Sequence, residues 1–353
     1  MKNKTVLVTG SGSIIGQGII KSLKLANSTT NNPIKYKIVC GDMSHKNASI
    51  YRGDVGVILP SPNSENYVTS IIEICKKNSV DAVFVGSDEE LIPLSENKNT
   101  IEEKTGSKVI SNPLQTIKIS LDKWNTFEFL KKNNLSCADS CLPEEKDEFI
   151  QKHGLPLVVK PRQGHGSLYF SIVHSIEELN YAVKTIEKVG WSAIIQEYLE
   201  ESNEYTTGVT VAKNGKTVMS SIAMKKILKH GQTYKAFLDD FKAIREHAEN
   251  IALKLGATGP INVQCCVDTE IPKTFEINPR FSATMPIRAV AGVNEVDIVF
   301  RNFVLGEEIK ITDYKKLVCF RYWNEVYVPY SDYEKLLKEK KIDSSGSYVV
   351  DYF

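Results

Sequence analysis

Three oxygen-bearing side chains stand in two short apolar segments between residues 262 and 280. Gln264 lies in NVQCCVD, whereas Glu276 and Asn278 lie in FEINPR. Two strands joined by the turn-prone TEIPK would place Gln264 beside Glu276, and side-chain alternation puts Asn278 on the face of Glu276. One carboxylate and two amide oxygens suit Mg²⁺, which shares its ligands with substrate phosphates, and Mn²⁺ accepts the same donors. We therefore predict a metal site at these three residues.

Two cationic residues, Lys160 and Arg280, predict that this site binds phosphate. Lys160 ends the apolar run of VVKPRQGHGS, and a lysine leaving a buried strand is costly without an anionic partner. The following glycines allow backbone N–H groups to fold over phosphate oxygens. Arg280, directly after Pro279, can brace a transferring phosphoryl group with its planar guanidinium. By itself, however, the Lys160 segment is more often an ordinary strand end beside a hairpin turn.

The segment IIQEYL at 194–199, followed by Glu204, is a candidate for binding a nucleoside. A strand that runs into a connector can offer backbone groups to an adenine edge, and a nearby carboxylate can accept hydrogen bonds from ribose hydroxyls. In isolation, these residues are better explained as ordinary strand and surface positions.

A glycine-containing turn with Gly10, Gly12 and Gly16 follows the first apolar run and leaves two interpretations open. It can bind the phosphates of NAD(P) at a helix N-terminus. However, the spacing is GxGxxxG and Asp42 lies outside the usual dinucleotide register, which favours tight turn packing or substrate binding. The segment Ser87–Glu90 is likewise either a substrate contact at a strand end or a helix N-cap.

The elements that must position these residues indicate an α/β and α+β protein. Residues 5–111 alternate apolar runs with helical patterns, which is typical of a parallel sheet with crossover helices. Between residues 155 and 281 the strands read as antiparallel, and Asn214-Gly215 predicts a tight hairpin turn. We expect a Rossmann-like domain over 1–113, a first lobe over 114–190, a second lobe with the metal site over 191–310, and a small C-terminal subdomain over 311–353.

Composition excludes several classes of protein. The 353 residues carry 44 Lys plus Arg against 43 Asp plus Glu, so no broad field predicts a nucleic-acid or membrane partner. No run reaches the length of a membrane span, and the seven cysteines suit a reducing cytoplasm. The histidines lack zinc-motif spacing, and no GxSxG indicates a serine hydrolase. Small-molecule substrates are therefore expected, and a homodimer stays open.

In order and spacing, these motifs resemble those of the ATP-grasp superfamily, and most closely the carbamoyl phosphate synthetase large subunit, over residues 1–306. The resemblance implies an N-terminal parallel-sheet domain before a two-lobed domain that binds ATP and Mg²⁺. It also implies roles for individual residues: phosphate contacts at Lys123 and Lys160, a covering loop with Gly164, Gly166 and Ser167, adenine contacts at Glu197, Tyr198 and Leu199, a ribose contact at Glu204, metal ligation by Gln264, Glu276 and Asn278, and catalysis by Lys160 and Arg280.

Two departures argue against carbamoyl phosphate synthesis. In that synthetase a second arginine follows three residues after the NPR arginine, and here this position is Ala283. The chain is also too short for two tandem synthetase halves. What remains resembles stand-alone ligases that join a small-molecule carboxylate to an amine, forming a carbon–nitrogen bond through an acyl phosphate.

Two other classes of function stay open at this point, together with one basic segment. The rivals are an NAD(P)-dependent oxidoreductase and a non-catalytic, ATP-binding regulatory protein. The segment with Lys225, Lys226 and His230 either reads an anionic acceptor or forms a solvated basic loop, of which the loop is the better supported.

Overall fold

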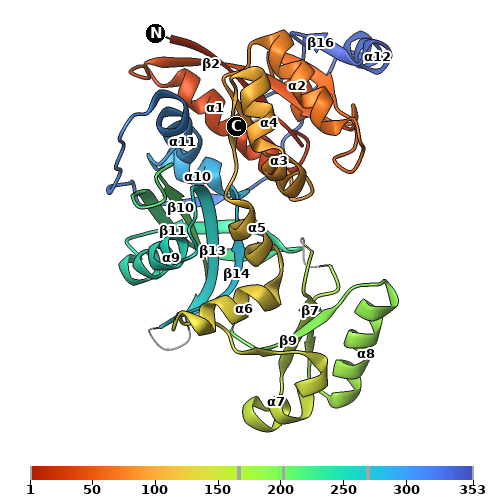
Figure 1. Ribbon diagram of the computed structural model, residues 1–353, viewed down its shortest axis with the longest axis vertical. Helices are drawn as coiled ribbons and strands as arrows, with labels where there is room; N and C mark the ends of the chain where they lie inside the picture. The colour runs from red at the N-terminus through yellow and green to blue at the C-terminus, as the bar shows by residue number, and fades with distance from the viewer. Residues whose placement is uncertain (1, 165–167, 201–202, 268–270, 352–353) are drawn as a thin grey trace.

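The computed structural model describes residues 2–164, 168–200, 203–267 and 271–351, and these form three β-sheets (Figure 1). The first sheet has the order β16-β3-β2-β1-β4-β5, with β1 to β5 parallel and β16 antiparallel to β3. Its elements are β1 (Lys2–Val8), α1 (Ile14–Ser28), β2 (Ile34–Asp42), β3 (Val55–Ile58), α2 (Tyr67–Asn78), β4 (Ala82–Phe84), α3 (Leu91–Glu96), α4 (Lys98–Thr105), β5 (Lys108–Ile110) and β16 (Lys341–Asp343). The predicted parallel-sheet N-terminal domain is therefore confirmed.

Both faces of the first sheet are buried, as expected for parallel strands. Leu7 of β1 packs with α2, α3 and α4 on one face, whereas its neighbours Val6 and Val8 point to the other. On that second face α1 packs against α10 (Met285–Val290) and α11 (Glu295–Leu305), in one apolar core that continues into the large antiparallel sheet. The first sheet and the large sheet are thus joined by a shared core.

The large sheet has the order β14-β13-β10-β11-β12-β15 and carries the predicted metal-site hairpin. Its β10–β11 hairpin turns at Asn214-Gly215, with Gly215 at a φ of 68°, as predicted. Helices α5, α6 and α9 pack against strands of this sheet. Their bounds, and those of the strands and of the last helix, are β10 (Glu204–Val211), β11 (Val218–Lys229), β12 (Gln232–Leu238), β13 (Gly259–Val267), β14 (Pro272–Asn278), β15 (Leu317–Phe320), α5 (Leu114–Leu121), α6 (Lys123–Lys132), α9 (Lys242–Lys254) and α12 (Tyr330–Glu339).

A small four-stranded sheet with the order β6-β9-β7-β8 stands apart with its own apolar core (Figure 1). It comprises β6 (Ser140–Cys141), α7 (Lys146–His153), β7 (Leu157–Pro161), β8 (Ser171–Val173), α8 (Ile176–Lys188) and β9 (Ala193–Glu197). The separation from the shared core makes this sheet one lobe and the large sheet the other. The predicted two-lobed α/β and α+β architecture is confirmed.

Two of the predicted boundaries differ from the observed pairing. β9 pairs with β7, Lys160 lying opposite Ile194, so residues 193–197 belong to the small lobe rather than to the second lobe that was expected from residue 191. We propose a division after Glu197. Residues 311–353 form no sheet of their own within the described chain: β15 extends the large sheet and β16 extends the first sheet. None of the described helices is long and apolar enough to cross a membrane.

Candidate functional site between the two lobes

The hairpin of β13 and β14 brings together the three side chains predicted to bind metal. Gln264 lies directly opposite Glu276 in the register, and Asn278 Nδ2 donates a hydrogen bond of 3.1 Å to Glu276 Oε1. Part of the predicted TEIPK turn lies outside the described residues. Side-chain alternation on paired strands thus places one carboxylate and two amides on a common face.

Glu276 is the acidic centre of the site. Burial raises the pKa of its carboxyl group, but the opposing fields of Lys123, Lys160 and Lys226, with the hydrogen bond from Asn278, bring that pKa below its usual value. Glu276 is therefore a carboxylate at neutral pH. Within the described chain no cluster of three or more His, Cys, Asp or Glu side chains could hold a metal, so a metal here would depend on Glu276 and amide oxygens.

Lys160 emerges from β7 as a nearly fully buried cation with a neutral partner. Its Nζ donates a 2.8 Å hydrogen bond to Gln196 Oε1 and lies 5.4 Å from the ring centre of Phe275. Burial and the charge of Lys123 lower the pKa of Lys160 to about 8. Within the described chain the Lys160 ammonium makes this one hydrogen bond and no ion pair. Such a cation is suited to receive an anion from outside the protein.

Lys123, the first residue of α6, lies against the turn that follows β7. Its Nζ donates to the Gly164 carbonyl at 3.2 Å, and its backbone N–H donates to the Arg162 carbonyl. Asp122 caps α6 through the N–H of Trp124 and binds the Arg162 guanidinium with both carboxylate oxygens. The predicted loop residues Gly166 and Ser167 lie outside the described residues.

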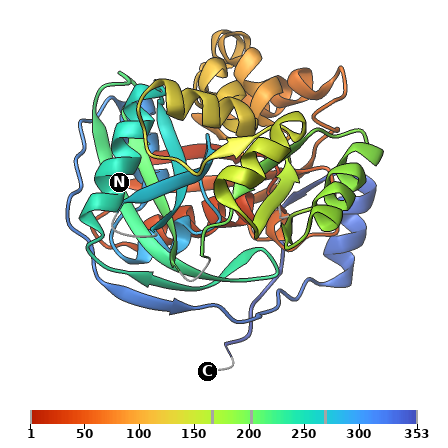
Figure 2. The ribbon, with the colours of Figure 1, turned by 90° about the horizontal axis from the view of Figure 1, so that it is seen from below.

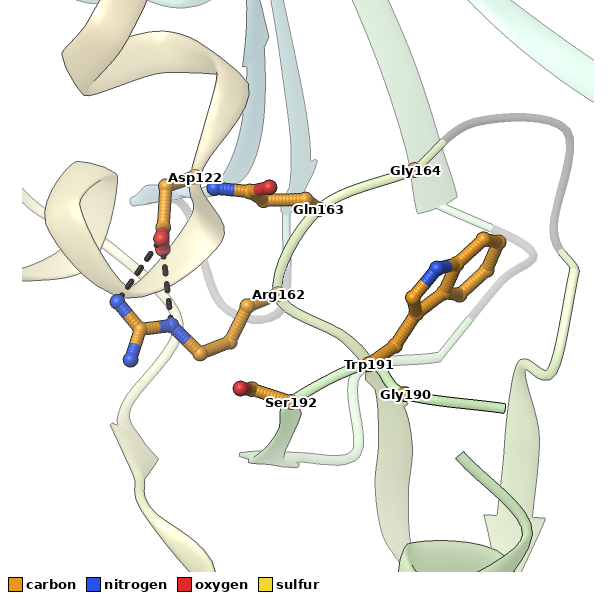
Figure 3. A pocket seen from close by; sticks show the side chains of 7 residues that line it. All are labelled: Asp122, Arg162, Gln163, Gly164, Gly190, Trp191 and Ser192. Carbon is orange, nitrogen blue, oxygen red and sulfur yellow. Dashed lines mark hydrogen bonds and ion pairs between the residues drawn. The ribbon is translucent and has the colours of Figure 1, made fainter. Parts of the chain in front are cut away.

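A pocket of about 520 Å³ opens beside this turn (Figure 3). It is lined by Asp122, Arg162, Gln163, Gly164, Gly190, Trp191 and Ser192. The Asp122–Arg162 ion pair closes one side of the pocket, and Trp191 stands on the other (Figure 3). None of the lysines or metal-site residues described above lines this pocket, and only Gly164, which Lys123 contacts, is shared with the candidate site. The nucleotide is therefore not assigned to this pocket.

Glu197, Tyr198 and Leu199 lie where β9 leaves the small sheet. The side chain of Glu197 is already engaged: Oε1 accepts from the Asp139 N–H at 2.7 Å, and Oε2 pairs with Lys273 of β14 at 2.8 Å. Tyr198 is exposed and Leu199 is half-buried. Any nucleobase contact at this connector would therefore come from the backbone and from these two side chains, rather than from the Glu197 carboxylate.

Lys226 is the residue of the site that the sequence interpretation undervalued. It lies on β11 and is nearly fully buried, with Nζ 2.7 Å from Glu204 Oε1 and donating to Gln264 Oε1. The expectation of a solvated basic loop is therefore wrong for Lys226. The available signal was strand alternation, because Lys226 shares the inward face with the buried Met224. Lys226 links the residue expected at ribose to a residue expected at the metal.

Arg280 connects the hairpin to the first sheet. Its Nε and Nη2 donate to the two oxygens of Asp88 at 2.6 and 2.9 Å. Burial lowers the pKa of Arg280, but the Asp88 carboxylate outweighs burial and raises it above the usual value. Asp88 follows β4, near the point where the strand order reverses between β1 and β4, which is the usual ligand-binding edge of such sheets.

The N-cap interpretation of the Ser87–Glu90 segment is not what the side chains show. Glu90 precedes α3, but its carboxylate makes no cap hydrogen bond and accepts instead from Thr9 Oγ1 and Tyr67 OH, at 2.8 and 2.7 Å. Burial raises the pKa of Glu90. Glu90 thus fixes the ends of β1 and α2, whereas Asp88 reaches the candidate site.

The N-terminal glycine turn satisfies most of its polar groups within the protein, although the buried Ser11 Oγ has no hydrogen-bond partner within the described chain. Ser13 Oγ caps α1 by accepting from the N–H groups of Ile15 and Gly16, and Asp42 accepts from the Gly12 N–H at 2.7 Å. A β-carbon on Gly16 would lie 2.4 Å from the Gly10 carbonyl oxygen, so glycine is needed there for packing. These contacts favour the tight-turn interpretation over a dinucleotide site.

Comparison with known families agrees with this arrangement segment by segment. Residues 6–110 match the PylC-like N-terminal domain, residues 114–257 match the D-ala D-ala ligase C-terminus, and residues 191–326 match the ATP-grasp domain described as lying in a biosynthetic pathway with the Ter operon. Together, these segment matches support an ATP-grasp ligase, as the order of the motifs predicted. The matched segments follow one another along the chain, and the last two overlap over residues 191–257.

The sequence is also similar to carbamoyl phosphate synthase large chains. It is 24% identical to the carbamoyl phosphate synthase large chain of Methanocorpusculum labreanum over 93% of its length, and 27% identical to that of Caldanaerobacter subterraneus over 88%. It spans about a third of the length of these curated relatives, 33% and 30% respectively.

Solved structures show the same fold at low sequence identity. N5-carboxyaminoimidazole synthetase from Staphylococcus aureus complexed with ADP gives a TM-score of 0.67 at 16% identity, covering 96% of this chain and 86% of that one. Biotin carboxylase from Campylobacter jejuni gives 0.65 at 17% identity, covering 84% and 70%.

Proposed function

We propose that this ATP-grasp protein is an ATP-dependent ligase that activates a small-molecule carboxylate as an acyl phosphate and joins it to an amine, releasing ADP and phosphate. The observation that carries the proposal is the charge arrangement around Glu276. Three lysines surround one carboxylate, and Lys160, one of the two that are buried, has a neutral amide as its hydrogen-bond partner. The N5-carboxyaminoimidazole synthetase structure with ADP supports nucleotide binding in this fold.

The triphosphate of ATP would lie between the two lobes. Lys160 and Lys123 face this space from the small lobe and from α6, and the Gly164 turn lies beside Lys123. The connector with Tyr198 and Leu199 would hold the adenine, and Glu204 would receive the ribose, in exchange for part of its contact with Lys226. Gly166 and Ser167 stay predicted members of the covering loop.

The metal-site residues fit Mg²⁺ and equally Mn²⁺. Glu276 would bind through its carboxylate and Asn278 through its amide oxygen, whereas Gln264 would have to share its oxygen with Lys226. Bound Mg²⁺ would neutralise charge on the phosphates during transfer. The low pKa of Glu276 keeps the ligand ionised without the metal.

The protein groups position the reaction and stabilise its charge. A substrate carboxylate oxygen attacks the γ-phosphorus, and the bond from that phosphorus to the bridging oxygen of ADP breaks. Lys160 and Arg280 balance charge on the transferring group, and Asp88 holds the Arg280 fork in a fixed plane. An amine nitrogen then attacks the acyl carbon, phosphate leaves, and the amine loses a proton.

Small molecules are the proposed partners of the site, in a cytoplasmic setting. All seven cysteines are free, and five of them lie in strands of the sheets described above, as suits a reducing compartment. The near-neutral net charge of +1 gives no support for nucleic-acid or membrane binding.

Trapping the acyl phosphate tests the function. Small amino acids, hydroxy acids and uronic-acid sugar nucleotides would be screened with ATP, Mg²⁺ and hydroxylamine, which converts an acyl phosphate to a hydroxamate without the natural amine. We expect ADP and phosphate only with a suitable carboxylate. AMP and pyrophosphate would rule out the acyl phosphate mechanism. ATP binding without cleavage under any carboxylate would leave the regulatory rival.

A further inference from the structure

The edge of the large sheet at β15 is an open strand whose four side chains are uncharged, with Lys315 and Lys316 directly before it. β15 pairs with β12 on one side, and among the described residues no strand pairs with its other side. Figure 2 shows the strand running along the outer margin of the molecule. Proteins usually protect such edges with lysine, proline or a bulge, because an open edge can pair with another chain.

The side chains of β15 alternate, but both sets are apolar or neutral. Leu317 and Cys319 are half-buried against the shared core, whereas Val318 and Phe320 are 51% and 65% exposed. Trp323 follows and is 95% exposed. A nearly fully exposed tryptophan beside an exposed phenylalanine is typical of a surface that is covered by a partner.

The only charged residue directly after the strand is turned inward. Arg321 donates to the carbonyls of Thr233 and Ala283. These bonds hold the guanidinium toward the protein, so it does not guard the edge. The same bonds tie the end of β15 to the segment that follows Arg280.

The hydrogen-bond pattern shows which backbone groups face the open side. The Arg321 N–H donates to the Tyr234 carbonyl at 3.0 Å, so Arg321 and Tyr234 form a hydrogen-bonded pair of the β12–β15 ladder. Because such pairs alternate along antiparallel strands, the N–H and C=O of Val318 and Phe320 point away from β12. Two donors and two acceptors are therefore available to another strand.

We propose that β15 is a dimer interface, at which the same strand of a second copy of this chain pairs antiparallel about Phe320. This register pairs the outward-facing backbone of Phe320 with itself, and sets Val318 opposite Tyr322 of the second copy. It also brings Lys315 of each copy to Glu325 of the other, and both side chains are exposed. Charge complementarity at both ends thus favours this self-pairing over an arbitrary partner.

The aromatic residues of this edge give the interface an adequate size. Phe320, Tyr322 and Trp323 of two copies amount to six aromatic side chains, each able to bury roughly 150–250 Å². Together they reach the order of 1,000 Å², which is the lower size of specific interfaces. A two-fold axis at Phe320 would join the large sheets of the two copies into one continuous sheet. The pairing does not involve the residues of the predicted nucleotide cleft.

Sedimentation velocity over roughly 0.1–100 µM protein tests the proposal. We expect the wild type to form dimers that dissociate on dilution, and Phe320→Lys to be monomeric with an unchanged circular dichroism spectrum. Tyr181→Lys is the matched control, because Tyr181 is 75% exposed on α8, away from this edge. A wild type that is monomeric throughout, or a dimer unaffected by Phe320→Lys, overturns the proposal.

A charge exchange checks the register even if Phe320→Lys does not fold. Lys315→Glu and Glu325→Lys should each weaken the dimer about tenfold, because each change places like charges together at both ends of the interface. The double variant should recover most of the wild-type affinity. Additive weakening in the double variant would contradict antiparallel pairing about Phe320.

Discussion

Two glycine-containing turns of this molecule follow buried strands, but they differ in how their charged and polar groups are satisfied. At the N-terminal turn, Ser13 and Asp42 accept the free N–H groups, and Glu90 accepts two hydroxyl hydrogen bonds nearby. At the turn after β7, Lys123 and Lys160 bond to a carbonyl and to a neutral amide. Both turns have the composition of an anion site, yet only the second has uncompensated positive charge.

The way the charged groups are satisfied distinguishes a turn that only packs from a turn that binds an anion, and it does so better than the glycine spacing. A glycine motif shows that the backbone approaches something closely, and at Gly16 that is the Gly10 carbonyl. A buried cation held by a neutral group, as at Lys160, instead indicates a missing anion, since unpaired buried charge is costly. If this distinction holds, phosphate binds at the second turn alone.

Lys160→Ala should have the largest effect. Removing the buried ammonium leaves the triphosphate and the transferring charge without their nearest cation, so we expect kcat/KM to fall by about 100- to 1,000-fold. Calorimetry with ATP and Mg²⁺ and a turnover assay would measure binding and rate. Lys184→Ala, at an exposed position on α8 of the same lobe, should change neither. Unchanged affinity and turnover in Lys160→Ala would remove the assignment.

Glu276→Gln should leave the fold intact and reduce turnover by about 100-fold at limiting Mg²⁺. The isosteric amide keeps the hydrogen bond with Asn278 but loses the only carboxylate of the proposed metal site. The thermal unfolding temperature and the Mg²⁺ dependence of the rate would be compared with the wild type. Normal turnover at limiting Mg²⁺ would place the metal elsewhere.

Asp88→Asn should lower kcat about tenfold while leaving the Kd for ATP unchanged, because Arg280 would lose one oxygen of its bidentate partner. Asp88→Glu should recover part of the loss, since it restores the charge. Glu103→Gln, on the exposed side of α4, serves as the control. An equal rise in the Kd for ATP would show that Asp88 supports the fold of the cleft rather than the position of Arg280.

The affinity for ATP should depend on pH above about 8. The pKa of Lys160 is lowered to about 8 by burial and by Lys123, so the free site is protonated below that pH and neutral above it. Bound phosphate favours the ammonium form, so affinity should be level below about pH 8 and fall by up to about tenfold per pH unit above it. Lys160→Arg, which does not titrate in this range, should flatten the profile. Identical profiles would contradict the assignment.

Ser13→Ala should have the smallest effect on function. Loss of the α1 cap should cost about 1 kcal/mol of stability, with no change in the Kd for ATP. Urea unfolding and calorimetry would measure the two quantities. A fall in ATP affinity beyond the change in folded fraction would show that the first turn takes part in binding.

The sequence predicted much of this arrangement because alternation and turn chemistry are local. The Gln264–Glu276 pairing follows from two strands and one turn, and the hairpin at Asn214-Gly215 uses the positive φ that glycine tolerates at Gly215. The sequence analysis assigned β9 to the wrong lobe. The sheet to which a strand belongs depends on the strand that pairs with it, and the apolar pattern of residues 194–196 fits a strand of either lobe.

The second limit on prediction from the sequence was a long-range side-chain pair. Arg280 is held by Asp88, which lies 192 residues earlier in the chain, and no local pattern joins these two residues. Lys226 and Glu204, in contrast, lie on neighbouring strands of one hairpin. Strand alternation alone, however, would have placed Lys226 on the buried face of β11 and shown that it needed a partner.

Calorimetric titration of the wild-type protein with ATP in Mg²⁺, and separately with NADPH, tests most directly whether the cleft at Lys160 and Glu276 is the nucleotide site. The account predicts that ATP binds, that binding is lost in Lys160→Ala and kept in Ser13→Ala, and that NADPH gives no binding heat. Tight binding of NADPH that Ser13→Ala weakens, with no binding of ATP, would contradict the account and assign the nucleotide to the first turn.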